Sequence, residues 1–117
     1  MKRKFRLRRL SDFMRVRQTG KSYTHPFLVL TVLPNPDDEL RIGVSAGKAL
    51  GSAVQRNRAK RRLRAAMEPL ITTLPKGWDL VLIARKPLLT ARFENLCQAV
   101  SSLLQRAKLA GFSDQPQ

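Results

Sequence analysis

The first twenty residues contain a short helical pattern. Apolar side chains recur at helical spacing around Ser11, which is a favoured N-cap residue, and Gly20 ends the pattern. The positions that share the predicted helical stripe are Leu10, Phe13, Met14 and Arg17. The chain therefore begins with a short helix that has one face turned toward a core.

Extended apolar segments predict a small sheet. Residues 27–33 are almost continuously apolar, which favours a strand buried on both faces, and residues 21–24 form a short extended piece before it. Residues 34–39 (PNPDDE) are rich in turn formers, so Leu40–Ser45 is predicted to return as the second strand of a hairpin. Trp78–Ala84 is the most strongly apolar strand candidate.

Two longer helices are predicted in the second half of the chain. Ser52 and Gln55 have the spacing of a capping box, and Pro69 should end the helix that this box begins. The apolar stripe of this helix consists of Ala59, Leu63, Ala66 and Met67. A final helix should run from an N-cap at Thr90 to about Leu109, with its stripe formed by Phe93, Leu96, Val100, Leu103 and Ala107.

These elements define the fold class as α+β. We expect a two-layer sandwich in which helices pack on a small mixed central sheet, in the order helix, strands, helix, strand, helix. All 117 residues form one predicted domain, with a basic arm at residues 1–9 and a fraying tail at residues 111–117. A strand–helix–strand unit would normally have a right-handed crossover.

The charge of the chain changes this picture from a generic small domain to a polyanion-binding one. It has 23 Lys and Arg against 8 Asp and Glu, a formal net charge of +15. Such self-repulsion is rarely tolerated without an anionic partner. No segment has the length of a membrane span or the pattern of a secretory signal, so no membrane partner is expected. Cys97 is the single cysteine, which fits a reducing cytoplasm.

The positive charge is concentrated on the helix that follows Ser52. No carboxylate occurs between Arg41 and Met67, so the usual i,i+4 ion pairs cannot form there. The face opposite the apolar stripe carries Asn57, Lys60, Arg61 and Arg64, with Arg58 at its edge. Arg56 and Arg62 flank the apolar stripe and could direct their guanidinium groups outward. We interpret this face as a nucleic-acid surface, the alternative being a merely basic surface. Residues 1–9 carry six further cations and are predicted to be a mobile arm that orders on a phosphate backbone.

Several sequence segments together resemble the bacterial ribonuclease P protein subunit. They are residues 41–45 (RIGVS), Lys48, residues 51–64 (GSAVQRNRAKRRLR) and residues 82–87 (LIARKP), with Phe13 and Gly20 in and after the first helix. The resemblance covers most of residues 6–108. It implies that the helix lies in a left-handed crossover, an exception to the usual handedness.

The resemblance also implies a function in which an RNA subunit is the catalyst. The protein would bind that catalytic RNA and the 5′ leader of precursor tRNA, and would assist Mg²⁺-dependent removal of the leader. The Mg²⁺ ions would be held mainly by RNA, and no dinucleotide cofactor is expected. The residues carried over to the catalytic RNA are Lys48, Arg56, Asn57, Arg58, Lys60, Arg61 and Arg64. Those carried over to a leader-binding cleft between the first helix and the sheet are Phe13, Arg17, Arg85 and Lys86.

Some of these assignments keep an alternative. Phe13 could be a plain core residue, and Asn57 could simply be exposed to solvent. Arg17 stands where many family members have a second aromatic residue, so contact there would use a guanidinium group. Ala49 replaces the second residue of a common lysine pair, which leaves Lys48 as the cation at the helix entrance.

The side chains of the protein do not suggest a catalytic set of their own. His25 is the single histidine and has no evident partner in the sequence, and the acidic residues outside the turn are scattered. The acidic residues in the turn at 34–39 could bind a cation, although solvent-facing turn chemistry explains them as well. A different class, a ribosomal protein without a catalytic partner, would share the same size and charge. A membrane-active peptide is disfavoured because the apolar face of the basic helix is narrow.

Overall fold

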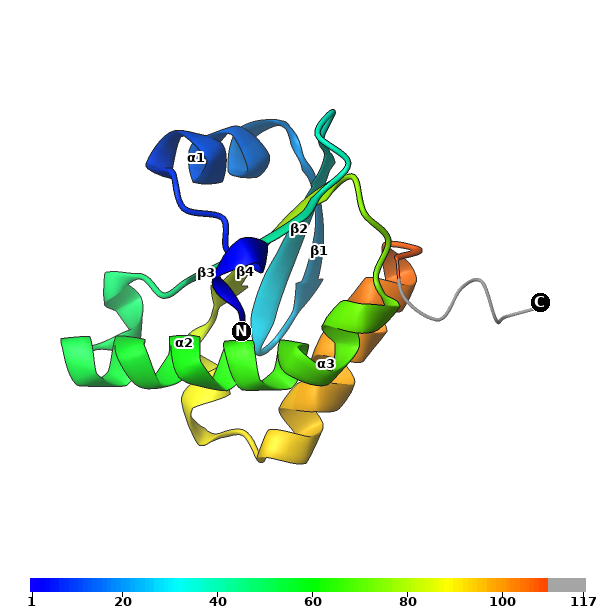
Figure 1. The fold of residues 1–117 in the computed structure, drawn as a ribbon. Coiled ribbons are helices and arrows are strands. Elements are labelled where there is room, and N and C mark those ends of the chain that lie inside the picture. The colour runs from blue at the N-terminus through cyan, green and yellow to red at the C-terminus, as the bar shows by residue number, and fades with distance from the viewer. Residues whose placement is uncertain (110–117) are drawn as a thin grey trace.

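The computed structural model describes residues 1–109, which form three α-helices packed on one four-stranded mixed sheet (Figure 1). The helices are α1 (Leu10–Thr19), α2 (Ala53–Met67) and α3 (Phe93–Arg106). The strands are β1 (Lys21–His25), β2 (Leu28–Pro34), β3 (Leu40–Ser45) and β4 (Trp78–Ala84). Short 3₁₀-helices connect them: η1 (Arg3–Phe5), η2 (Lys48–Leu50), η3 (Glu68–Thr73) and η4 (Lys86–Thr90). The predicted α+β class is confirmed, and none of the described helices is long and apolar enough to cross a membrane.

The sheet has the strand order β1-β2-β4-β3, and this order corrects one prediction. β2 and β3 do not form a hairpin, because β4 lies between them, antiparallel to β2 and parallel to β3. The hairpin is instead formed by β1 and β2, which pair from Lys21 opposite Val32 to His25 opposite Leu28. Proximity in sequence favoured pairing across the turn at residues 34–39. The two most apolar strands, β2 and β4, instead take the centre of the sheet, where each pairs with a strand on both edges and most of its residues are buried.

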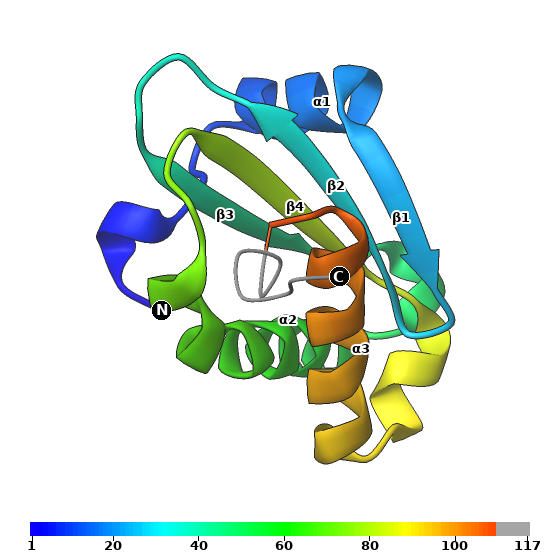
Figure 2. The same ribbon diagram turned by 90° about the vertical axis from the view of Figure 1, so that its right-hand side faces the viewer.

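The parallel strands β3 and β4 are joined through α2 on the face that α3 also covers (Figure 2). Seen from that face, the connection has a left-handed sense, as the family resemblance implies. The connection leaves the end of β3, passes through η2, α2 and η3, and returns to the start of β4.

Side chains alternate between the two faces of the sheet and build two separate cores. On β4, Leu80 and Leu82 point to α2 and α3, where they join the main core with Leu63 and Met67. Val81 points to the other face and packs with Val16 of α1 in a smaller core. α1 therefore covers part of one face, whereas α2 and α3 cover the opposite one (Figure 1).

The prediction for α2 is confirmed in detail. The Ser52 hydroxyl accepts a hydrogen bond from the backbone N–H of Gln55, and the Gln55 side chain accepts one from the N–H of Ser52. The helix ends at Met67, and Pro69 follows in η3. The buried residues of α2 are the four predicted ones, Ala59, Leu63, Ala66 and Met67.

The beginnings and exposed faces of α1 and α3 differ from the prediction. α1 begins at Leu10 with Arg9 as N-cap, so Ser11 lies inside the helix. Leu10 is 75% exposed and Met14 is 49% exposed, while Val16 is completely buried. α3 has Arg92 rather than Thr90 as N-cap, and Phe93 is 45% exposed. In both helices the first apolar residue, Leu10 in α1 and Phe93 in α3, lies outside the buried face, so its side chain projects outward.

The basic arm is packed against the fold, which corrects the prediction that it is mobile. Leu7 is 5% exposed, and its backbone N–H donates to the carbonyl of Ile42 at 2.9 Å. Phe5 packs against the main core. The outer edge of β3 offers free backbone groups, and two apolar residues spaced among the cations are enough to hold the arm there. The predicted tail at residues 111–117 lies outside the described residues.

Candidate nucleic-acid interface

The outer face of α2 carries the predicted cationic residues. Asn57, Arg58 and Arg61 are exposed there, whereas the side chains of Lys60 and Arg64 are half-buried at its borders. The Ser52 cap and the apolar stripe fix the rotation of the helix, so the opposite side must face outward. Lys48 is exposed on η2, which leads into the helix, and Arg56 is half-buried beside the stripe.

These cations have no carboxylate partner within residues 1–109. The ion pairs of the described chain involve other residues, and the Nε atoms of Arg56 and Arg64 are buried without a hydrogen-bond acceptor in that part of the chain. Burial, and then the positive charge of Arg6, lower the pKa of the Arg64 guanidinium. A bound anion would supply hydrogen-bond acceptors to these arginines, and its negative charge would offset the repulsion between Arg6 and Arg64.

Arg62 has a structural role that differs from the prediction. It was expected to direct its guanidinium group outward, but Nη1 donates to the carbonyl of Leu88 and Nη2 to that of Ala91. Both acceptors belong to η4 and its C-cap, so Arg62 ties α2 to the segment that follows β4. The cations of α2 therefore divide into an outward group and one inward residue.

Phe13 lies on the face of α1 that contacts the sheet. Its ring covers Gly43 of β3 so closely that a β-carbon at Gly43 would come within 2.3 Å of the ring. Phe13 packs with the smaller core formed by Leu7, Val16 and Val81, yet it is only half-buried. The residue is therefore part of a core and part of a surface at once.

A strip of sheet beyond Phe13 is left uncovered by α1. Its members follow one register row across the four strands: Thr24, Val29, Ile83 and Ser45. The last three are half-buried, and Thr24 is exposed. We call this row the floor strip. It spans about 14 Å between the outer strands, given a strand spacing of about 4.8 Å.

The other residues predicted for the leader cleft come from α1 and from the segment that follows β4. Arg17 is exposed one helical turn after Phe13 on α1. Arg85 follows Ile83 on the same face of the chain and is exposed, with Nη1 3.4 Å from the carbonyl oxygen of His25. Lys86 is exposed at the start of η4. The Phe13 ring covers Gly43, which pairs with Val81 of β4. Arg85 is four residues after Val81, so the two positions are about 13 Å apart along the strand, at about 3.3 Å per residue.

Asp79 is a buried residue whose role was not predicted from the sequence. Its side chain is completely buried, and its carboxylate accepts hydrogen bonds from Arg15, Arg41 and Asn35. Hydrogen bonding to Asp79 raises the pKa of Arg41. The sequence signal was present, because Asp79 is the single charged residue within the otherwise apolar strand Trp78–Ala84. A charge in such a position needs a partner from another element.

The fold and this surface together define a class of protein. A small α+β protein presents a helix face that is cationic and free of carboxylates, and on the α1 side of its sheet it carries a half-buried aromatic ring. This is the arrangement expected of a nucleic-acid-binding protein.

Comparison with known proteins identifies the family within that class. Residues 1–108 match the family model Ribonuclease P. The ribonuclease P protein component of Herpetosiphon aurantiacus is 44% identical over 116 residues, which cover 99% of this chain and 94% of that protein. The structure of the Staphylococcus aureus RNase P protein superposes with a TM-score of 0.82 at 28% identity, covering 92% of this chain and 98% of the other. The RNase P protein of Thermotoga maritima gives a TM-score of 0.76 at 31% identity, covering 86% and 96%.

The chain therefore belongs to the ribonuclease P protein family. Members of this family are the protein component of ribonuclease P, the nuclease that processes the 5′ leaders of tRNA and in which the protein acts with an RNA subunit.

Proposed function

We propose that the outer face of α2 binds the catalytic RNA of ribonuclease P. The residues in contact would be Lys48, Arg56, Asn57, Arg58, Lys60, Arg61 and Arg64. The observation that carries this proposal is the absence of carboxylate partners for these cations within residues 1–109. Arginine forks can pair with two phosphate oxygens at once, and Asn57 can donate to and accept from a sugar or phosphate.

The floor strip beside α1 would bind the 5′ leader of precursor tRNA. A leader is single-stranded, so its bases are free to stack on an aromatic ring, and such stacking tolerates any sequence. Phe13 would supply the ring, the floor strip would supply the surface beneath the leader, and Arg17, Arg85 and Lys86 would contact phosphates at the rim. Because the aromatic residue common in this family is replaced by Arg17, the guanidinium plane would stack there instead.

Cleavage would be carried out by the RNA with its Mg²⁺ ions. Among residues 1–109, no three His, Cys, Asp or Glu side chains are grouped so that they could hold a metal ion. The carboxylates of Asp12 and Asp37 are engaged by Arg15 and Arg41. His25 is used locally, because its Nδ1 accepts a hydrogen bond from the backbone N–H of Phe27. We therefore assign to this chain the binding and orientation of two RNAs. The site of action would be the cytoplasm.

A reconstitution tests this function. Purified protein is added to a ribonuclease P RNA at a Mg²⁺ concentration too low for the RNA alone, and removal of the leader from precursor tRNA is followed. We expect a gain in cleavage that depends on the protein. If the protein binds the RNA without any gain, it is a scaffold, as a ribosomal protein would be, and the proposal fails. A variant with both Arg58→Ala and Arg61→Ala serves as a control that should lose the gain.

A further inference from the structure

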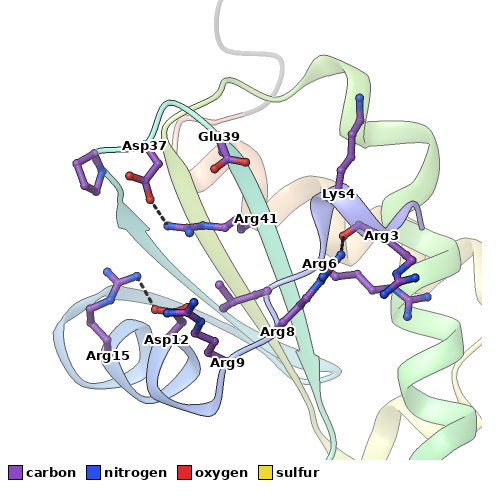
Figure 3. A pocket seen from close by; sticks show the side chains of 12 residues that line it. Arg3, Lys4, Arg6, Arg8, Arg9, Asp12, Arg15, Asp37, Glu39 and Arg41 are labelled. Carbon is purple, nitrogen blue, oxygen red and sulfur yellow. Dashed lines mark hydrogen bonds and ion pairs between the residues drawn. The ribbon is translucent and has the colours of Figure 1, made fainter.

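An open cleft lies where the basic arm crosses the outer edge of the sheet (Figure 3). It has a volume of about 790 Å³ and extends from the arm to Asp12 and Arg15 of α1 and to residues 36–41 at the start of β3. This is separate from the floor strip, because the cleft is on the side of α1 that faces Asp79, whereas the floor strip crosses β4 four residues further along, at Ile83. We call it the arm cleft.

The arm cleft is strongly cationic once internal pairing is taken into account. Seven of the side chains that line it are cationic and three are acidic. Asp12 lies 3.6 Å from Nη2 of Arg15, and Asp37 lies 3.3 Å from Nη2 of Arg41, so these two carboxylates are largely neutralised within the protein. The arm cations Arg3, Lys4, Arg6, Arg8 and Arg9 are exposed and form no ion pair with any described carboxylate.

The arm is held in place before any ligand arrives. The Leu7 N–H to Ile42 carbonyl hydrogen bond extends the sheet by one bridge, and Phe5 and Leu7 are inserted into the two cores. The cations that alternate with these apolar residues therefore project from a fixed backbone. Binding of a ligand to these cations therefore does not carry the entropic cost of ordering the chain.

Arg6 connects the arm cleft to the cationic face of α2. It lines the arm cleft and also a second cavity of about 210 Å³, which Arg64 and Phe13 line as well. The charge of Arg6 contributes to the lowered pKa of Arg64, so the two guanidinium groups are close enough to repel. In both ribbon views the arm lies between α1 and the C-terminal part of α2 (Figures 1 and 2). Cations thus continue from Arg61 and Arg64 through Arg6 to Arg3, Arg8 and Arg9.

From this continuity we infer that the arm cleft is a second binding site for the sugar-phosphate backbone of the catalytic RNA. The strand that contacts α2 continues over Arg6 and places its next phosphates against Arg3, Arg8 and Arg9. This inference rests on the proposed function of α2. The ligand is an RNA backbone rather than a small anion, because the cations are spread along an open cleft.

The test replaces the charges of the cleft without disturbing the apolar anchors of the arm. A variant with Arg3→Gln, Arg8→Gln and Arg9→Gln is compared with a matched control carrying Lys21→Gln, Arg92→Gln and Lys108→Gln. The control loses the same net charge from exposed positions that do not line the cleft. Binding of the full-length catalytic RNA is measured over a range of salt concentrations. The arm variant should lose roughly two units from the magnitude of the salt slope, since each phosphate contact contributes about 0.7–0.9.

A footprint of the RNA adds a readout of position. Nucleotides whose protection is lost in the arm variant should lie beside those whose protection is lost in Arg61→Ala, on the same strand. Equal salt slopes for arm variant and control overturn the inference. So does a loss confined to precursor tRNA binding by the holoenzyme, which would make the leader the occupant. If circular dichroism shows that the triple variant is unfolded, Arg8→Gln alone is measured, with an expected loss about a third as large.

The α2 variants and the arm variant together distinguish a failure of the arm cleft from a failure of the proposed function of α2. If the α2 variants lose affinity and the arm variant does not, only the arm cleft is excluded. If both sets of variants bind the catalytic RNA as well as the unaltered protein does, the proposed function of α2 fails.

Discussion

Nη2 of Arg15 lies 2.6 Å from Oδ2 of Asp79, and this contact joins α1 to the central strand β4. Nε of Arg41 donates to the same carboxylate at 2.8 Å, and the Asn35 amide donates at 2.9 Å. Four elements of the fold therefore meet at one buried charge. Because Phe13 lies on the same helix and packs over Gly43 of the neighbouring strand β3, the Arg15–Asp79 contact also helps to orient the aromatic ring over the sheet.

Replacing Asp79 should destabilise the protein. Asp79→Asn keeps the volume of the side chain but removes the charge that Arg15 and Arg41 need, and hydrogen bonds to charged groups are worth about 1.5–3 kcal/mol. We expect a loss of that order in the free energy of unfolding, measured by urea denaturation. Glu94→Gln is the control, because Glu94 and its partner Arg92 are both exposed and should change stability by less than about 0.5 kcal/mol. Equal stability of the two variants would contradict the role of Asp79.

Arg62 and Arg58 should separate stability from RNA binding on the same helix. Arg62→Ala removes the two hydrogen bonds to the carbonyls of Leu88 and Ala91, so it should lower the free energy of unfolding by about 1.5–3 kcal/mol. Its effect on the salt dependence of RNA binding should be negligible in the folded protein. A change in the salt slope with unchanged stability would place Arg62 in the interface instead.

Arg58→Ala and Arg61→Ala should have the opposite signature. Each exposed guanidinium is expected to contact one phosphate, so each variant should lose about one unit from the magnitude of the salt slope for catalytic RNA. Stability should change by less than about 0.5 kcal/mol, because both side chains are exposed. A slope equal to that of the unaltered protein would exclude these residues from the interface.

The sequence was sufficient for α2 because every signal for that helix is local. The Ser52–Gln55 cap, the buried stripe through Leu63 and the position of Pro69 all lie within one segment, and each is confirmed. The distribution of cations follows from the same helical period. Such a segment can be read from its own residues, with no knowledge of the rest of the fold.

The sheet order and the arm could not be predicted in this way, because both depend on contacts between distant segments. Nothing within residues 34–39 indicates that β4 will insert between β2 and β3. The charges of the arm suggested disorder, whereas Leu7 finds a site on the edge of β3 that is formed only in the folded sheet. Asp79 likewise acquires its partners from α1, β3 and the turn before β3.

Gly43 should not tolerate a side chain. In Gly43→Ala the new β-carbon would meet the Phe13 ring at 2.3 Å, so the ring must move out of its core, at a cost of about 1–3 kcal/mol in the free energy of unfolding. Gly47→Ala is the matched control, because within residues 1–109 a β-carbon there would meet no heavy atom within 4 Å other than those of its chain neighbours. The double variant Gly43→Ala with Phe13→Ala should be less destabilised than the sum of the two single variants. Strict additivity would show that the ring does not occupy this position in solution.

Phe13 should contribute to recognition of the leader beyond its contribution to the core. Phe13→Leu retains an apolar side chain over Gly43 but removes the flat aromatic surface on which a base can stack. The holoenzyme carrying this variant should bind precursor tRNA more weakly by about 1–3 kcal/mol, the usual worth of stacking one base, and should bind mature tRNA as before. Leu10→Ala is the control on the same helix, because Leu10 is 75% exposed on the outer side. Equal losses for precursor and mature tRNA would mean that Phe13 acts only through the fold, since the two RNAs differ by the leader alone.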